Sequence, residues 1–426
     1  MLAFAIPLMV AACDLGKEFS TPEAWTRPAA EFVAAHSDDG FKFASQKRDI
    51  ANCMERGACT WHGLEVWEAR IYYGDSGATR VEMSLYNRGD ATQSDTLNAA
   101  KLRSLLDDIA GKAQPGGKIG SNPEKKKLDN DGFLYSKRWS RSEGDVELAW
   151  GVNSAKAKEL TADFVRVTMH AKGAAKQRSS TRLGTGVVSK AKARANVRKN
   201  AEGDVWIDGV PMVDQGQKGY CAAATSERVL RYYGFAIDEH EIAQAAGTTA
   251  QGGTSVDEMK EAVRKVGSKC RLGFNDIVSM TGSFKNIEKD IEQYNRFAKK
   301  EGARTIAMRD FMRGSAFSVP EMREAMKPEI VLKMRMKDSR YRKFLSGVKS
   351  QVDQGMPVFW GVTLGMFPEP DIPQANGGHM RLIIGYNAKK HEVLYSDSWG
   401  AGHELKRMPE DKAFAITHDA FFLRPL

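Results

Sequence analysis

A basic segment without any acidic residue divides the chain into two parts. Residues 171–200 contain nine Lys or Arg and no Asp or Glu, and small residues and glycines make up much of the rest, as is typical of an exposed linker. The chain of 426 residues has a formal net charge of +9. The nine positive charges of this segment equal that net charge, so positive and negative residues balance in the rest of the chain. The sequence therefore predicts two folded units, residues 19–170 and 204–426, joined by a basic linker at 171–203.

The charge of this linker allows other interpretations. It could be attracted to an anionic envelope surface such as lipid or wall polymer, or it could be the place where the N-terminal unit is cut off. Nucleic acid is a weaker alternative, because no aromatic side chain that could stack on a base lies among the charges. We expect a solvated linker, with an anionic envelope surface as its alternative partner and no specific nucleic acid.

The chain begins with an apolar run that ends at Cys13. Such a run is too short to span a bilayer but suits the apolar region of a secretory signal, although the usual basic start is missing. The sequence VAAC at residues 10–13 resembles the bacterial lipobox, in which the cysteine is lipidated. We expect a leader of signal or lipoprotein type at 1–18 and an exported protein, in the periplasm or cell envelope. Membrane attachment through a lipidated Cys13 and a buried N-terminal strand are both left open.

Cysteine usage excludes a disulfide scaffold. The chain has five cysteines and no Cys-x-x-Cys pair, so a structural zinc site is not expected either. Apolar residues make up 42% and charged residues 27% of the chain, which is ordinary globular composition. In an exported protein Cys53 and Cys59 could close a small disulfide loop, and two separate core thiols are the alternative.

The N-terminal unit mixes two hydrophobic periods. Apolar residues alternate in residues 64–73 and 79–87 and in three further runs between 132 and 171, whereas residues 96–112 have helical spacing. We expect a mixed, mostly antiparallel α+β domain. Its histidines are scattered singly and form no catalytic cluster, so its role stays open, with an inhibitory pro-segment as one hypothesis.

The C-terminal unit begins with two helices and ends in strands. One helix is predicted from Cys221 to about Tyr233, closed by Gly234, and a second at 255–267, with a capping box at its start. A largely helical insertion is expected at about 275–354. Strand-like runs then continue to the end of the chain, at 357–364, 380–387, 391–400, 412–417 and 420–426.

Three residues of this unit could carry chemistry together. Cys221 follows a glycine-broken turn at a helix start, where unpaired amides and the helix dipole stabilise a thiolate. His379 lies at the start of a predicted strand and Asp397 at the end of the next, so a short hairpin would bring the carboxylate beside the imidazole. This order predicts a nucleophile, a base and the group that orients the base.

These residues and their neighbours resemble the catalytic set of papain-like cysteine peptidases. In that family a glutamine six positions before the cysteine donates to the oxyanion, and an Asn-Ser-Trp-Gly motif orients the histidine. Gln215 has this spacing to Cys221, and Asp397-Ser398-Trp399-Gly400 resembles the motif. The resemblance implies that Gln215 is the oxyanion donor and that Trp399 shields the hydrogen bond between His379 and Asp397 from water.

The chain is most similar to the bacterial branch related to bacteriocin-leader (double-glycine) processing peptidases. The cysteine motif QGQKGYC, which has few of the papain signature residues, and the sequence GGTSVDEMKEAVRKVG support this similarity. The resemblance implies Gly252, Gly253 and Thr254, together with Trp399, as substrate-binding candidates. It covers roughly residues 205–426 and implies a papain-like α+β domain, with a helix lobe that carries the cysteine and an antiparallel barrel lobe.

The chain also departs from the family. The papain signature has cysteine, serine and tryptophan where this chain has Lys218, Tyr220 and Ala222, and Asp397 replaces the usual asparagine. A carboxylate can still orient the histidine and favours its charged form. We therefore expect an exported cysteine peptidase that acts on peptides or proteins without a metal or organic cofactor. The alternatives are a peptidoglycan amidase or endopeptidase with the same thiol chemistry, and a catalytically silent binding module.

Overall fold

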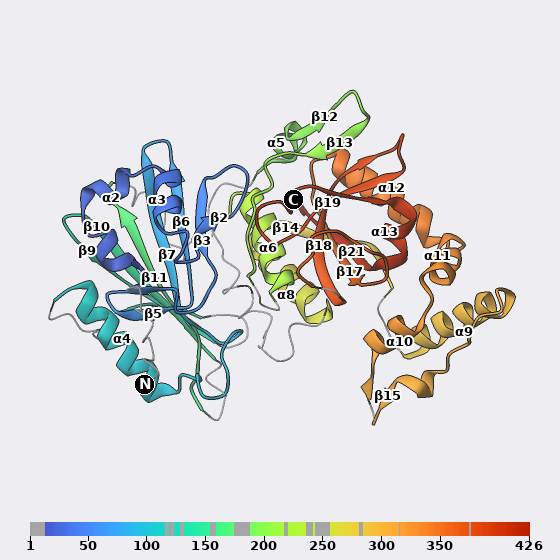
Figure 1. Cartoon of the computed structure of the whole chain (residues 1–426), viewed down its shortest axis with the longest axis horizontal. Helices are drawn as coiled ribbons and strands as arrows, with labels where there is room; N and C mark the ends of the chain where they lie inside the picture. The colour runs from blue at the N-terminus through green and yellow to red at the C-terminus, as the bar shows by residue number, and fades with distance from the viewer. Residues whose placement is uncertain are drawn as a thin grey trace, which may run out of the picture.

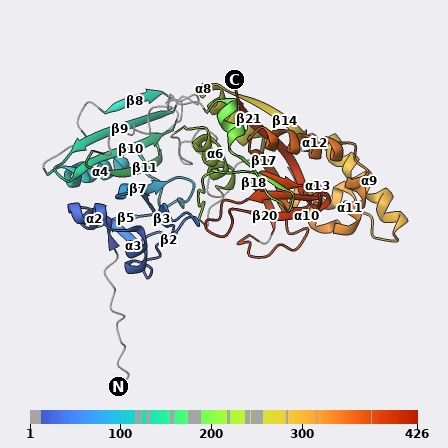
Figure 2. The same cartoon turned by 90° about the horizontal axis from the view of Figure 1, so that it is seen from above.

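The structure is a computed structural model of the chain. It describes residues 13–115, 119, 123–127, 132–153, 159–173, 188–216, 220–235, 242, 256–280, 284–314, 316–374 and 376–426. Two units lie side by side, the first drawn in blue to green and the second in yellow-green to red (Figure 1), and the turned view in Figure 2 shows the same separation. In the described part of the chain, no helix has both the length and the apolar character needed to cross a membrane.

The N-terminal unit is built on an antiparallel sheet. Its strand order is β2-β3-β6-β7-β11-β10-β9-β8, with β2 (Lys42–Phe43), β3 (Ile50–Cys53), β6 (Glu68–Gly74), β7 (Gly77–Asn87), β8 (Glu124–Lys127), β9 (Phe133–Ser140), β10 (Gly144–Val152) and β11 (Ala162–Ala171). Helix α4 (Ala99–Ala113) begins at the Asn98 cap and buries one side of apolar residues in the core. The predicted mixed, antiparallel α+β architecture is confirmed.

Smaller elements complete this unit at its N-terminal end. They are α1 (Leu15–Glu18), α2 (Pro22–Thr26), α3 (Ala29–Ala35) and a small sheet of β1 (Cys13–Asp14), β4 (Cys59–Trp61) and β5 (Leu64–Val66). Cys13, Cys53 and Cys59 are free thiols buried in the core of the unit. Cys13 is a register partner of Cys59, and the Cys53 and Cys59 thiols are neighbours that influence each other's pKa. Of the two interpretations, a disulfide or two core thiols, the structure shows Cys53 and Cys59 as free thiols in the core.

The C-terminal unit has a second sheet with helices packed on it. The strand order is β12-β13-β18-β17-β21-β14, and β19 and β20 continue from β18; the strands are β12 (Val197–Lys199), β13 (Asp204–Ile207), β14 (Leu272–Ser279), β17 (Val358–Leu364), β18 (Gly377–Asn387), β19 (Glu392–Ser396), β20 (Lys406–Pro409) and β21 (Thr417–Pro425). Every residue of β17 is buried, as expected of a central strand with both faces covered. Helices α6 (Cys221–Tyr232), α8 (Val256–Lys269) and α12 (Arg340–Asp353) pack against this sheet. The predicted α+β class, with helices packed on an antiparallel sheet, is confirmed.

Two local predictions in this unit are wrong. The run at 412–417 is not a strand, because Pro409, Glu410 and Asp411 form a favourable helix start and α13 (Glu410–Ile416) buries the apolar residues that follow. Helix α8 does not stop at Gly267 but continues to Lys269. Gly267 serves packing there, since a Cβ would lie only 3.0 Å from the Leu423 side chain.

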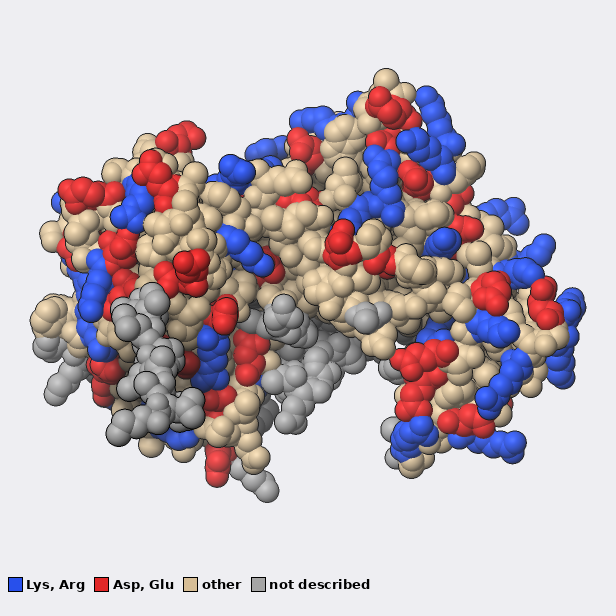
Figure 3. All heavy atoms as spheres, viewed as in Figure 1, with Lys and Arg blue, Asp and Glu red and all other residues tan. Residues whose placement is uncertain are grey.

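The predicted helical stretch and linker contain parts of the sheet. Residues 275–354 begin inside β14, and α12 at their end packs on the sheet. Between β14 and α12 lie, drawn in yellow to orange in Figure 1, α9 (Phe284–Lys300), a hairpin of β15 (Met312–Arg313) and β16 (Ala316–Phe317), α10 (Val319–Ala325) and α11 (Pro328–Met336). Within 171–203, helix α5 (Lys190–Ala195) and strand β12 belong to the second unit. On the face shown in Figure 3, Lys and Arg are interspersed with Asp and Glu over both units.

Candidate active site

Cys221 is the first residue of helix α6, as the sequence predicts. The helix ends at Tyr232, and Gly234 follows with the positive φ of +87° that a glycine accepts without strain. Burial by itself raises the pKa of the Cys221 thiol. The nearby imidazole of His379 and the Met380 backbone outweigh burial and lower the pKa of the thiol below its ordinary value.

His379 and Asp397 form a buried pair beside this thiol. His379 lies near the start of β18 and Asp397 directly follows β19, and the two antiparallel strands bring Nε2 of His379 to 2.5 Å from Oδ1 of Asp397. Both side chains are fully buried. Burial alone lowers the pKa of His379, but the charge and hydrogen bond of Asp397 and the Cys221 thiol raise it to about 9. Burial raises the pKa of Asp397, yet His379 and Arg381 hold it at about 2.

Trp399 covers the imidazole from one side. Its ring lies parallel to that of His379, with 4.3 Å between ring centroids and 8° between planes. Trp399 is itself buried. The indole therefore keeps water from that face of the pair and strengthens the electrostatic interaction inside it.

Arg381 is a member of the site that the sequence analysis missed. Its Nε donates to Oδ2 of Asp397 at 2.7 Å, and its Nη1 donates to both carboxylate oxygens of Glu369, at 3.1 and 2.8 Å. The Tyr395 hydroxyl donates to Glu369 at 2.6 Å. A signal existed in the sequence, because a charged residue two positions after His379 in an apolar strand must face the same side of the sheet.

Hydrogen bonds join helix α6 to the strands that carry His379 and Asp397. Thr225 donates to the Met380 carbonyl at 3.2 Å and lies 3.2 Å from the Ser398 hydroxyl. Arg228 donates to the Asp397 carbonyl at 2.8 Å and to Ser396 Oγ at 2.5 Å. These buried contacts fix the helix end, and with it the thiol, relative to the imidazole.

Gln215 lies in the extended segment before α6. Its backbone N–H donates to the Ser398 carbonyl at 2.8 Å, and its side chain is buried. This places Gln215 next to the end of β19, in the neighbourhood of the catalytic candidates. The substrate-binding candidates Gly252, Gly253 and Thr254 lie outside the described residues.

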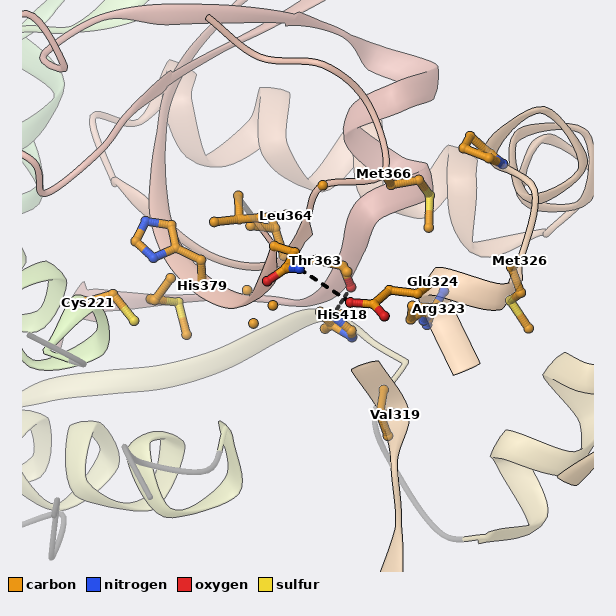
Figure 4. A pocket seen from close by; sticks show the side chains of 18 of the residues that line it. Cys221, Val319, Arg323, Glu324, Met326, Thr363, Leu364, Met366, His379 and His418 are labelled. Atoms are coloured by element: carbon orange, nitrogen blue, oxygen red, sulfur yellow. Dashed lines mark hydrogen bonds between the residues drawn. The ribbon is translucent and has the colours of Figure 1, made fainter. Parts of the chain in front are cut away.

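A pocket of about 720 Å³ opens at Cys221 and His379. Figure 4 shows these two side chains at one end and Val319, Arg323, Glu324 and Met326 at the other. The lining also includes residues of β17 and β18 and His418 of β21. The helical stretch after β14, which was predicted only as an insertion, therefore forms a wall of the pocket.

A group of side chains that could bind a metal lies outside this site, in the N-terminal unit. The ligand atoms of Cys13, His36 and Asp39 lie within 4.8 Å of one another in the N-terminal unit. His36 Nδ1 already pairs with Asp39 at 2.9 Å, and burial together with nearby carboxylates raises the pKa of Cys13 to about 12. A protonated thiol is a poor metal ligand. This cluster is separate from the Cys221 thiol, which lies beside the His379 imidazole in the C-terminal unit.

Comparisons with known proteins agree with this chemistry. The family model described as Peptidase C39 family matches residues 209–278, and the one described as Peptidase_C39 like family matches residues 293–420. The first range contains Cys221, and the second contains His379 and Asp397.

Among curated proteins no match is found. Among solved structures, one similar chain is Xylellain, a cysteine protease from Xylella fastidiosa, at 17% identity and a TM-score of 0.17. The similarity covers 19% of this chain and 37% of that chain. Residues 209–278 and 293–420 of the C-terminal unit are thus similar to cysteine peptidases of the C39 and C39-like families.

Proposed function

We propose that this protein is an exported cysteine peptidase that hydrolyses peptide bonds with Cys221, His379 and Asp397 as its catalytic triad. The observation that carries the proposal is that the Cys221 thiol and the His379 imidazole meet at one end of the pocket, with the Asp397 carboxylate bonded to the imidazole behind them. The depressed pKa of the thiol and the raised pKa of the imidazole support an ion pair at neutral pH. Gln215 is the proposed oxyanion donor.

The reaction follows from these protonation states. The Cys221 thiolate attacks the carbonyl carbon of the scissile bond, and the developing oxyanion accepts hydrogen bonds from the Gln215 side chain and the Cys221 backbone N–H. The His379 imidazolium then gives its proton to the leaving amine. The neutral imidazole next takes a proton from water, whose oxygen attacks the thioester, and collapse of the intermediate restores the thiolate and the imidazolium. Asp397 keeps the imidazole in one orientation and stabilises its charge.

Export is proposed from the N-terminal sequence alone. The apolar run before Cys13 has the length of a signal sequence core. The Cys13 thiol is buried between β4 and the neighbouring core, which does not favour a lipid on that sulfur in this conformation. We therefore place the protein outside the cytoplasm without relying on a lipid anchor. An anionic envelope surface stays a proposed partner of the basic segment.

The proposed activity is tested by incubating the full chain with casein, with a mixture of unstructured peptides and with purified cell wall. We expect new amino termini in the protein and peptide samples, detected by mass spectrometry, and loss of this activity after alkylation with iodoacetamide. Release of wall fragments with intact casein and peptides would instead favour the amidase or endopeptidase alternative. Cleavage that survives complete alkylation of Cys221 would contradict thiol catalysis.

A further inference from the structure

The wall of the pocket opposite Cys221 contains a buried arginine that makes no hydrogen bond within the described part of the chain. The Arg323 side chain is 7% exposed, and its contact with an acid within the described residues is Nη2 to Asp290 Oδ2 at 3.9 Å. Its Nε atom is buried and has no hydrogen-bond partner. A buried guanidinium in this state is costly, because neither hydrogen bonds nor a close counter-charge replace its lost hydration.

Asp290 cannot neutralise Arg323 because another arginine holds it. Arg335, which is 1% exposed, donates to Asp290 Oδ2 at 2.8 Å and to Oδ1 at 3.5 Å. Repulsion from Arg335 adds to burial in lowering the pKa of Arg323 to about 10, at which the guanidinium is still charged at neutral pH. Arg335 also lies 3.7 Å from Asp338, but Asp290 is the acid that both arginines approach within the described residues.

The rest of the pocket is suited to a substrate group that brings a negative charge. His418 is hydrogen-bonded to Thr363, and burial and the two arginines lower its pKa to about 3, so it is neutral. Val319, Met326 and other apolar side chains line the remainder, and such surroundings strengthen an ion pair. Glu324 is exposed at the rim, where its carboxylate accepts from Asn376 at 3.3 Å.

We propose that this end of the pocket is a subsite for a carboxylate of the peptide substrate, bound by Arg323. This inference rests on the proposed peptidase function and names its substrate class: peptides with an acidic side chain, or a terminal carboxylate, near the scissile bond. The charged oxygens supply the hydrogen bonds and the counter-charge that Arg323 lacks.

The test first maps cleavage sites of the full chain in a mixture of unstructured peptides, where Glu or Asp should be enriched at one position near the scissile bond. Fluorogenic peptides with Glu or Gln at that position are then compared. We expect kcat/KM to be about 10-fold to 100-fold higher for Glu. Peptides that end in a free carboxylate or an amide separate a terminal carboxylate from a side chain.

Substitutions assign the preference to Arg323. In Arg323→Gln the Glu-to-Gln ratio should fall to about 1 while the Gln peptide is still cleaved, which shows that the variant folds; Arg323→Lys should keep part of the preference. Arg309→Gln, which removes a highly exposed arginine of the same region, is the matched control and should keep the wild-type ratio. Glu324→Gln should raise the ratio, because it removes a negative charge at the rim.

Two outcomes contradict the subsite while leaving the peptidase intact: cleavage without acidic preference, or a preference that Arg323→Gln does not change. If no peptide is cleaved, the proposed function fails instead. Binding of the Glu and Gln peptides to Cys221→Ala then decides on the subsite, and equal affinities would overturn it.

A second inference comes from contacts between the two units. Asp214, which precedes Gln215, is held by the N-terminal unit: Asn52 Nδ2 donates to its Oδ2 at 3.1 Å, and Arg70 Nη2 donates to its carbonyl at 3.1 Å. At the other end of the same segment, the Tyr220 hydroxyl donates to Asn87 Oδ1 at 2.5 Å.

The two units also approach each other closely at two glycines near these hydrogen bonds. A Cβ on Gly89 would lie 2.0 Å from the Tyr220 hydroxyl, and a Cβ on Gly216 would lie 3.2 Å from Met54 Cε. None of the described residues that line the pocket comes from the N-terminal unit. The N-terminal unit therefore holds Asp214, next to Gln215, and Tyr220, next to Cys221, by hydrogen bonds, and its described residues do not fill the pocket.

We infer that the N-terminal unit positions the oxyanion segment for catalysis, with Asn52 and Asn87 as positioning residues. In the full chain, Asn52→Ala and Tyr220→Phe should each lower kcat about 10-fold with little change in KM. Tyr72→Phe removes the hydroxyl that accepts from Arg231 at the far end of α6 and is the control that should keep kcat. An unchanged kcat in the first two variants would overturn this inference, and a raised kcat would overturn it and favour the inhibitory pro-segment.

Discussion

Replacement of Cys221 by alanine should abolish peptide hydrolysis, with kcat/KM lower by at least about 10⁴-fold. The thiolate is the atom that forms the bond to the substrate in the proposed mechanism, and no other cysteine lines the pocket. Cys13, Cys53, Cys59 and Cys270 are all buried. The measurement is hydrolysis of a fluorogenic peptide, with the melting midpoint as the check that the variant folds.

The matched control for this loss is Cys270→Ala. That residue is 2% exposed in the core of the same unit and does not line the pocket. It should retain kcat/KM even though the variant is somewhat less stable. Full activity of Cys221→Ala would show that the hydrolysis uses another nucleophile.

Replacement of Asp397 by asparagine should be poorly tolerated here, although asparagine is the residue that papain-like peptidases usually carry. Both carboxylate oxygens are in use: Oδ1 pairs with His379, and Oδ2 accepts from Arg381 Nε at 2.7 Å. An asparagine has only one acceptor oxygen, so its amide nitrogen would face another donor. We expect kcat/KM at neutral pH to fall about 10²-fold.

The same substitution should change the pH dependence. Activity needs the charged imidazole, so it is lost as pH rises through the pKa of His379, which is about 9 in the wild type. Without the negative charge of residue 397, burial continues to lower this pKa and its main opposing influence is gone. The alkaline limb of kcat/KM should therefore move to lower pH. An unmoved limb would contradict the role given to Asp397.

Arg381 explains why the chain has aspartate at this position, and a double variant tests the explanation. In Asp397→Asn combined with Arg381→Gln, the residue at 381 offers an acceptor as well as donors, so the conflict with the asparagine amide is relieved. The double variant should recover part of the activity that Asp397→Asn loses, in a double-mutant cycle of kcat/KM. Additive losses would indicate that the two side chains act independently.

Local signals in the sequence were sufficient for much of the site. The helix that begins at Cys221 was predictable from a glycine-broken turn before it and Gly234 after it. The meeting of His379 and Asp397 followed from a short hairpin between antiparallel strands. Both depend on neighbours along the chain, so pattern and spacing capture them.

Features that depend on tertiary contacts could not be predicted in this way. Arg381 finds Glu369 through folding, and Arg323 reaches the pocket only because α10 folds back toward β17 and β18. The alternating run at 412–417 suits a strand, but its cap residues and its burial as α13 decide for a helix. Periodicity alone does not resolve so short an apolar run.

The ion pair between Cys221 and His379 is the central claim, and the rate of alkylation of Cys221 tests it most directly. Iodoacetamide labelling of wild type and His379→Ala, followed by peptide mapping at several pH values, compares Cys221 with the four buried cysteines as internal controls. An ordinary cysteine has a pKa of about 8.5, so rapid labelling of Cys221 at about pH 5.5 that is lost in His379→Ala is the predicted result. Slow labelling at that pH, equal in both proteins, would contradict the account.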